Sequence, residues 1–148
     1  MKEINFYHLT TTTLEKALPK LMEKVYATGK HALLVTGSEE RAAVIDRLLW
    51  SYTTIRFLPH GVKADGNHEL QPIFVSPDME NLNKSEILVV INGAEFDEAK
   101  FSKVLYMFDG NNDEETAKSR EVWNQMKKKG FTLSYHKQDD EGKWQKAA

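Results

Sequence analysis

Three runs of apolar residues constrain the fold of this chain most strongly. They are His31–Thr36, Glu86–Ile91 and Lys103–Phe108, and in each the apolar residues follow one another almost without interruption. A strand with one solvated face alternates apolar and polar residues, whereas a parallel strand covered on both faces gives a continuous apolar run. Helical patterns separate these runs, so the sequence predicts a three-layer α/β fold, with a mostly parallel sheet between helices on both faces.

The other elements follow from periodicity and turn residues. Ser38 is expected to cap a helix, and Gly29 and Gly130 are expected to end helices. Helices are predicted at about 12–28, 38–50 and 113–129, a short one at 97–102, and further strands at 4–9, 73–75 and 131–137. Residues 51–71 are expected to be irregular. The whole chain, 1–148, is interpreted as one domain that ends in a polar tail at about 138–148.

Composition narrows the classes of function. Twenty Lys and Arg stand against 22 Asp and Glu, which gives a net charge of −2. Global charge therefore gives no reason to expect nonspecific binding to nucleic acid or to a membrane surface. The absence of cysteine excludes disulfides, a thiolate nucleophile and a cysteine zinc site. With no secretory pattern and no apolar run of about 18 residues, the chain is expected to be soluble and cytoplasmic.

The turns that could hold a phosphate are acidic. An α/β sheet raises the expectation of a nucleotide site where strands end and helices begin. The turn at 36–40 lacks the glycine-rich cradle and the lysine of a phosphate-binding loop, and Glu39 and Glu40 occupy the positive end of the following helix. The positive end of the last helix is likewise occupied by acidic residues, Asp113, Glu114 and Glu115. The sequence therefore predicts no cofactor.

Metal-binding and catalytic constellations are also not expected. The irregular loop carries His60, Asp65, His68 and Glu69, but their spacing matches no metal-ligand pattern, and they are interpreted as solvated loop residues. No catalytic triad and no paired carboxylates emerge elsewhere. We therefore expect a protein that binds partners and has no catalytic residues.

Trp50 is the first sign of a partner. On the helix at 38–50, the residues Ala42, Ile45, Leu48 and Leu49 form one stripe, and Trp50 points well away from it. A tryptophan off the core stripe exposes a large apolar surface, which favours contact with another protein. A second apolar group, Phe57–Pro59, follows seven residues later.

The helix at 113–129 carries a second candidate surface. Ser119, Val122 and Met126 are expected to face inward, with Trp123 at the edge of that face. Thr116, Arg120 and Lys127 form the adjacent stripe. Trp123 can be a core residue beside solvated cations. Alternatively, the aromatic rim and the two cations can bind a small anionic ligand with an aromatic tip, because a guanidinium holds a carboxylate in bidentate fashion.

Many short segments, in order along nearly the whole chain, resemble one family. These segments are Phe6–Leu9, Leu14–Leu21, Leu34–Ala42, Leu49–Trp50, Phe57–Gly61, Gln71–Ile73, Asn92–Ala94, Phe108–Gly110 and Gly130–Leu133. Together they resemble the chi subunit of bacterial DNA polymerase III. The resemblance implies a Rossmann-like domain without a functional nucleotide site, and an accessory part of the clamp-loader assembly with no catalytic activity of its own.

The resemblance also implies partners and site residues. The psi subunit would contact Trp50, Phe57, Leu58 and Pro59, and a helicase would compete for much the same surface. The acidic C-terminal tail of single-stranded-DNA-binding protein, which ends in Pro-Phe, would bind the second surface, so contact with nucleic acid would be indirect. Tail-binding residues carried over from the family are Phe108, Arg120, Trp123 and Lys127, with Lys118 as a further cation and Thr116 where some relatives place a lysine.

A different class of function stays open from the residues alone. A divergent nucleotide-binding enzyme would share the predicted α/β fold. The two hypotheses differ at the carboxyl ends of the strands, where an enzyme of this kind needs a cleft suited to phosphate.

Overall fold

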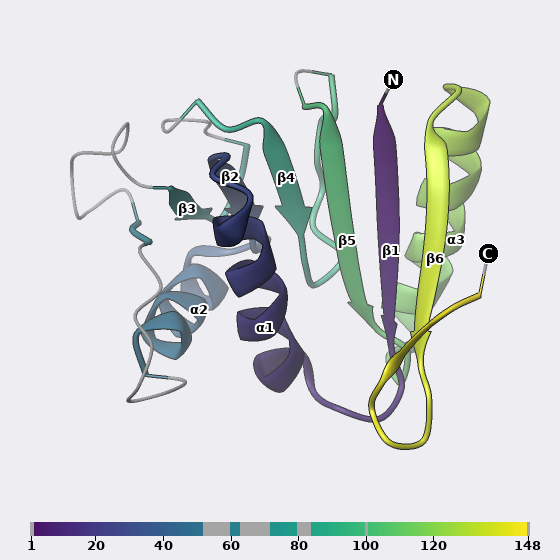
Figure 1. The fold of residues 1–148 in the computed structure, drawn as a ribbon, viewed down its shortest axis with the longest axis horizontal. Coiled ribbons are helices and arrows are strands. Elements are labelled where there is room, and N and C mark those ends of the chain that lie inside the picture. The colour runs from purple at the N-terminus through teal and green to yellow at the C-terminus, as the bar shows by residue number, and fades with distance from the viewer. Residues whose placement is uncertain (1, 52–59, 63–71, 80–83, 100, 148) are drawn as a thin grey trace.

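The computed structural model describes residues 2–51, 60–62, 72–79, 84–99 and 101–147. In this part of the chain seven strands form one sheet, in the order β3-β2-β4-β5-β1-β6-β7 (Figure 1). All neighbouring pairs are parallel except β6 and β7. The strands are β1 (Glu3–Leu9), β2 (Ala32–Val35), β3 (Ile73–Ser76), β4 (Ile87–Val90), β5 (Lys103–Asp109), β6 (Thr132–Gln138) and β7 (Trp144–Lys146).

Helices cover both faces of the sheet, as the sequence predicts. Helices α1 (Leu14–Ala27) and α2 (Glu39–Ser51) pack on one face, and α3 (Asp113–Lys128) packs on the other (Figure 1). Every residue of β2, β3 and β4 is buried. Alternate residues of these strands enter the two separate apolar clusters. The continuous apolar runs therefore mark strands covered on both sides.

The residues predicted to cap and end the helices do so in the structure. The Ser38 hydroxyl accepts the backbone N–H of Arg41 at 3.2 Å, which caps α2. Gly29 and Gly130 follow the ends of α1 and α3 with φ of 76° and 82°. A side chain strains this left-handed conformation, so glycine suits both positions.

Two parts of the sequence reading differ from the structure. Residues 97–102 form no helix in the described part of that segment. Phe101 is buried in the core instead, and Glu98 forms an ion pair of 2.5 Å with Lys129. The polar tail also contains a strand: β7 pairs with β6, and Trp144 packs edge-on against Tyr7 with ring centroids 5.4 Å apart. Aromatic packing therefore stabilises a short strand in a segment whose polar sequence does not predict one.

The topology places distant segments beside one another. Strand β1 lies between β5 and β6, so that Phe6 is level with Tyr106 on one side and Tyr135 on the other. Helix α3 connects β5 to β6 and packs over this region. Residues near 8, 120 and 135 consequently meet on the face that α3 covers.

Candidate functional site

A cavity of about 400 Å³ lies between α3 and the strands β1 and β6. Its lining is polar and aromatic: His8, Thr116, Ser119, Arg120, Trp123, Asn124 and Tyr135. We call this cavity the α3 pocket. It brings together Thr116, Arg120 and Trp123, three of the residues expected at the second candidate surface.

Aromatic rings form one wall of the α3 pocket. The Trp123 ring lies 5.3 Å from Phe6 and 5.8 Å from Tyr135 between centroids, and it meets Tyr135 edge-on. Edge-on and tilted pairs of this kind hold aromatic side chains in fixed orientations. Trp123 is thus both packed against the core and part of the pocket lining, so the two readings of this residue are compatible.

Phe108 lies behind the pocket. It is fully buried, and its ring contacts His8 at 4.7 Å between centroids. A ligand in the α3 pocket would meet His8 and Tyr135 first, because these residues line the cavity and Phe108 does not. Phe108 supports the pocket floor.

The cations expected at this surface occupy different places. Arg120 lines the pocket and is exposed. Lys127 is exposed two helical turns beyond Arg120, on the same side of α3 but outside the pocket lining. Lys118 forms an ion pair of 2.5 Å with Glu95 and lines a different cavity. Of these cations, the structure therefore places Arg120 in the lining of the α3 pocket, and it places Lys118 elsewhere.

His8 and Tyr135 are site residues that the sequence did not identify. The His8 Nδ1 and the Tyr135 hydroxyl oxygen lie 2.5 Å apart. Burial lowers the pKa of His8, and Lys137 and Arg120 lower it further, while Asp109 acts in the opposite direction. Burial raises the pKa of Tyr135 against an opposing effect of Arg120. Only the pairing of β1 with β6 brings these residues together, and local sequence spacing does not encode that pairing.

Trp50 is exposed, as predicted. Its side chain is 54% exposed at the end of α2, whereas Ala42, Ile45 and Leu49 are buried. Its ring lies 5.0 Å from the ring of His60. Phe57, Leu58 and Pro59 lie outside the described residues, so the predicted surface is seen only at Trp50.

His60 corrects an expectation. The sequence predicts a solvated loop residue, but His60 is only 4% exposed. Its Nε2 lies 3.0 Å from a carboxylate oxygen of Asp46, on the face of α2 near Trp50. The same nitrogen is hydrogen-bonded to the backbone carbonyl oxygen of Asp46 at 3.1 Å, so this buried histidine attaches its part of the chain to α2 beside Trp50. Asp65, His68 and Glu69 lie outside the described residues.

The crevice where a nucleotide would bind is acidic. Strand order reverses between β2 and β4, and α/β folds bind ligands beyond the carboxyl ends of strands at such a point. A cavity of about 560 Å³ lies there, with Gly37, Asn92 and Gly93 in its lining. Three carboxylate side chains, Asp78, Glu95 and Asp97, also line it, against the single cation Lys118. This charge pattern disfavours phosphate and agrees with the acidic turn read from the sequence.

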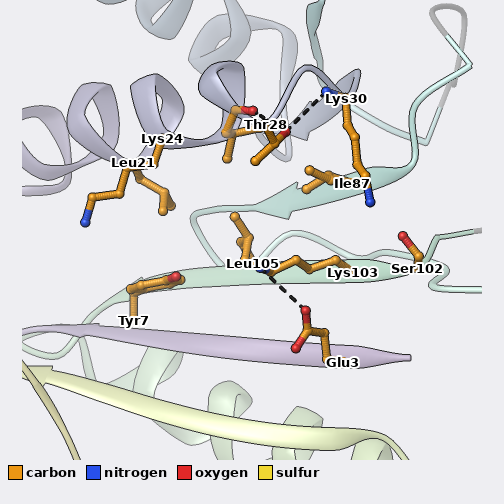
Figure 2. Close-up of a pocket in the computed structure, with 11 residues that line it drawn as sticks. Glu3, Tyr7, Leu21, Lys24, Thr28, Lys30, Ile87, Ser102, Lys103 and Leu105 are labelled. Carbon is orange, nitrogen blue, oxygen red and sulfur yellow. Dashed lines mark hydrogen bonds and ion pairs between the residues drawn. The ribbon is translucent and has the colours of Figure 1, made fainter. Parts of the chain in front are cut away.

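A further cavity of about 440 Å³ lies under α1, at the amino ends of β1, β4 and β5. Figure 2 shows Leu21, Lys24 and Thr28 on the helix side and Leu105 on the sheet side. Its two other lysines are already paired, Lys30 with Glu86 at 3.8 Å and Lys103 with Glu3 at 3.5 Å. This cavity lacks the exposed guanidinium and aromatic wall of the α3 pocket.

Among the described residues, no group of three or more His, Asp or Glu side chains is arranged to hold a metal ion. Within the same residues, none of the helices combines the length and apolar character needed to cross a bilayer.

Comparison with known proteins identifies the family. The family model described as "DNA polymerase III chi subunit, HolC" matches residues 1–134. A Haemophilus influenzae protein named DNA polymerase III subunit chi is 27% identical over 137 residues, covering 90% of this chain and 95% of that protein. The Escherichia coli protein of the same name is 22% identical over 142 residues, covering 90% and 97%. A Rickettsia prowazekii protein named probable DNA polymerase III subunit chi is 29% identical over 92 residues, which span 62% of this chain and 56% of that protein. This chain belongs to the family of DNA polymerase III chi subunits.

Proposed function

We propose that this chain links DNA polymerase III to single-stranded-DNA-binding protein by binding the acidic C-terminal tail of that protein in the α3 pocket. One observation carries the proposal: an exposed arginine and a tryptophan, Arg120 and Trp123, line the same small cavity. A chi-family protein is an accessory subunit of the polymerase. Such a subunit would contribute through contacts with other proteins.

The pocket suits a peptide that ends in an aromatic residue. The terminal Phe ring would lie against Trp123 and Tyr135, and its α-carboxylate would pair with Arg120. A guanidinium can donate two parallel N–H bonds to a carboxylate, which fixes the orientation of the chain end. Upstream acidic residues of the tail would then lie near Lys127. Thr116 contributes no charge, and its hydroxyl lies 3.5 Å from the Gly110 carbonyl oxygen.

Titration calorimetry with an acidic peptide ending in Pro-Phe tests this proposal. We expect the peptide to bind, and a peptide lacking the final Phe to bind much more weakly. Arg120→Ala should weaken binding by about ten- to hundredfold, because a hydrogen bond to a charged group contributes about 1.5–3 kcal/mol. Lys128→Ala is the matched control, since Lys128 is an exposed cation of α3 outside the pocket lining. Equal binding by the wild type and Arg120→Ala would refute the pocket assignment.

Variants of Lys127 and Lys118 distinguish binding in the α3 pocket from a general effect of positive charge. Lys127→Ala should weaken binding at low salt, and the effect should shrink at about 0.15 M salt, where the Debye length is about 8 Å. Lys118→Ala should leave binding unchanged, because Lys118 pairs with Glu95 beside another cavity. Equal losses of affinity in both variants would show that the tail binds through the overall positive charge of α3 and not in the α3 pocket.

We propose that the psi subunit binds at Trp50. Support comes from the 54% exposure of this side chain on a helix whose other large apolar residues face the core. Large aromatic residues contribute disproportionately to protein interfaces. The surface lies on the face of the sheet opposite α3, so both partners could bind at once. A competing helicase would be displaced by psi and not by the tail peptide.

A further inference from the structure

The α3 pocket has a polar end whose hydrogen-bonding groups the tail-binding proposal does not use. His8 and Tyr135 form it, with the His8 Nδ1 at 2.5 Å from the Tyr135 hydroxyl oxygen. On the other side, the imidazole occupies the space that a side chain at Gly110 would fill. A Cβ at Gly110 would come within 2.1 Å of the His8 Nε2, so only glycine leaves room for the ring. The histidine is thus held in a fitted position, with one nitrogen against Tyr135.

Charged groups surround His8 from three elements. Lys137 is its partner in register on β6, Arg120 approaches from α3, and Asp109 lies on β5. Burial, and to a smaller extent the two cations, disfavour the imidazolium and lower the pKa of His8, and the single carboxylate only partly opposes them. In the empty pocket the imidazole is therefore predominantly neutral at neutral pH.

A carboxylate beside Arg120 changes this balance. It neutralises one of the two cations that disfavour protonation, and it adds a negative charge in the cavity that His8 lines. Both changes favour the imidazolium, because a nearby opposite charge stabilises the charged form of an ionisable group.

Protonation also changes which group donates in the pair of His8 and Tyr135. A neutral imidazole with an unprotonated Nδ1 accepts the tyrosine hydroxyl hydrogen, so that hydrogen is not available to a ligand. An imidazolium carries hydrogen on both nitrogens. Its Nδ1–H then donates to the Tyr135 oxygen, and the tyrosine O–H becomes free to donate to an anion in the pocket.

We propose that His8 takes up one proton from solvent when an anionic ligand enters the α3 pocket, and that Tyr135 then donates its hydroxyl hydrogen bond to the ligand carboxylate. The tyrosine keeps its own proton throughout. This inference rests on the proposed tail-binding function and adds its regulation: the pocket binds a terminal carboxylate more tightly as pH falls. The sign follows from linkage, since a complex that holds one more proton than its separate partners gains stability at lower pH.

Calorimetry with the full chain tests proton uptake directly. The probe is the acidic Pro-Phe peptide with an acetylated N-terminus, which removes the α-amino group that would titrate between pH 6 and pH 8, while the carboxylates stay ionised over this range. Titration at pH 7 in two buffers of different ionisation enthalpy should give uptake of about 0.3–0.5 proton per peptide, and affinity should rise about three- to tenfold from pH 8 to pH 6.

Two variants assign the proton. His8→Gln should still bind the peptide but show neither proton uptake nor the change in affinity with pH. His136→Gln is the matched control, because His136 is on the opposite face of β6, stacked against Tyr7, and it should behave as the wild type. Tyr135→Phe should lose most of the gain in affinity at pH 6.

The outcomes separate this inference from the proposed function. Peptide binding without proton uptake would overturn the role of His8 and leave tail binding intact. Proton uptake that persists in His8→Gln would also overturn it. No binding to the wild type at either pH would refute both proposals.

Discussion

The side-chain amide of Gln138 bonds Thr12 twice: Oε1 accepts the Thr12 backbone N–H at 3.2 Å, and Nε2 donates to the Thr12 hydroxyl at 2.7 Å. The same Oε1 accepts the backbone N–H groups of Thr10 and Thr11, each at 3.1 Å. Gln138 is buried. The position at which the sequence begins to read as a polar tail is therefore the residue that ties the β1–α1 loop to the end of β6.

Replacing Gln138 should destabilise the fold. Gln138→Leu removes the acceptor for three partly buried backbone N–H groups, and losing such hydrogen bonds should cost about 1 kcal/mol or more. Urea denaturation should show a lower midpoint with an unchanged slope. Gln125→Leu is the control, since Gln125 is exposed on α3 and its replacement should change stability by less than about 0.5 kcal/mol. Equal stability of the two variants would contradict the role of Gln138.

Two tyrosines should respond in opposite ways to loss of the hydroxyl. The Tyr106 hydroxyl is buried and has no hydrogen-bond partner among the described residues, so Tyr106→Phe should raise the free energy of unfolding by about 1 kcal/mol. The Tyr135 hydroxyl pairs with His8, so Tyr135→Phe should lower it by about 0.5–1.5 kcal/mol. Thermal and urea unfolding measure both. A loss of stability in Tyr106→Phe would show that its hydroxyl is satisfied after all.

Asp139 should make the hairpin of β6 and β7 sensitive to acid. Its carboxylate accepts the backbone N–H groups of Lys143 and Glu141, each at 2.9 Å, and these bonds hold its pKa below the ordinary value of 3.8. A carboxyl group with a lowered pKa stabilises the fold above its unfolded pKa, and the contribution disappears as pH falls through the folded pKa.

The test compares wild type with Asp139→Asn from pH 5 to pH 2. The wild type should be more stable at pH 5, and the difference should close on acidification, as followed by thermal unfolding and by protection of the Lys143 amide. Asp140→Asn, one residue further along and exposed, is the control. A difference that stays constant with pH would rule out the charged hydrogen bonds as its cause.

Trp50 and Tyr26 provide a matched pair for the psi surface. Among the described residues they are the large hydrophobic side chains with high exposure, 54% and 44%. If psi binds at Trp50, then Trp50→Ala should weaken psi binding by about 2 kcal/mol or more, or roughly thirtyfold. Tyr26→Ala, on α1, should bind psi as the wild type does. Equal losses would indicate a broad apolar contact not centred on Trp50.

Most of the fold was predictable because its signals are local. Residues 87–91 are apolar throughout, and a run of that length covered on both faces has few alternatives to a central strand. Ser38, Gly29 and Gly130 act through the few residues beside them. Residues 97–102 misled the prediction because Phe101 packs into the core there, and tertiary burial overrides weak helical spacing. Strand β7 depends on Trp144 meeting Tyr7, 137 positions away.

The α3 pocket was predictable only on its helical side. Helical spacing groups Thr116, Arg120 and Trp123 from the sequence alone, and the structure places all three in one cavity. His8 and Tyr135 belong to strands that meet only once the order of the whole sheet is known. The positive charge of Lys118 suggests a place in the pocket, but Lys118 pairs with Glu95. Glu95 lies outside α3, so the spacing of residues along the helix gives no sign of this ion pair.

The central place of β1 has a consequence for synthesis. This strand leaves the ribosome before both of its partners, because β5 and β6 begin only at residues 103 and 132. Translation at about 5–20 residues per second leaves β1 unpaired for several seconds or more. The α3 pocket needs His8, Arg120 and Tyr135 together, so a truncated or stalled chain cannot form it. If the tail binds in the α3 pocket as proposed, only a chain translated through β6 could bind it.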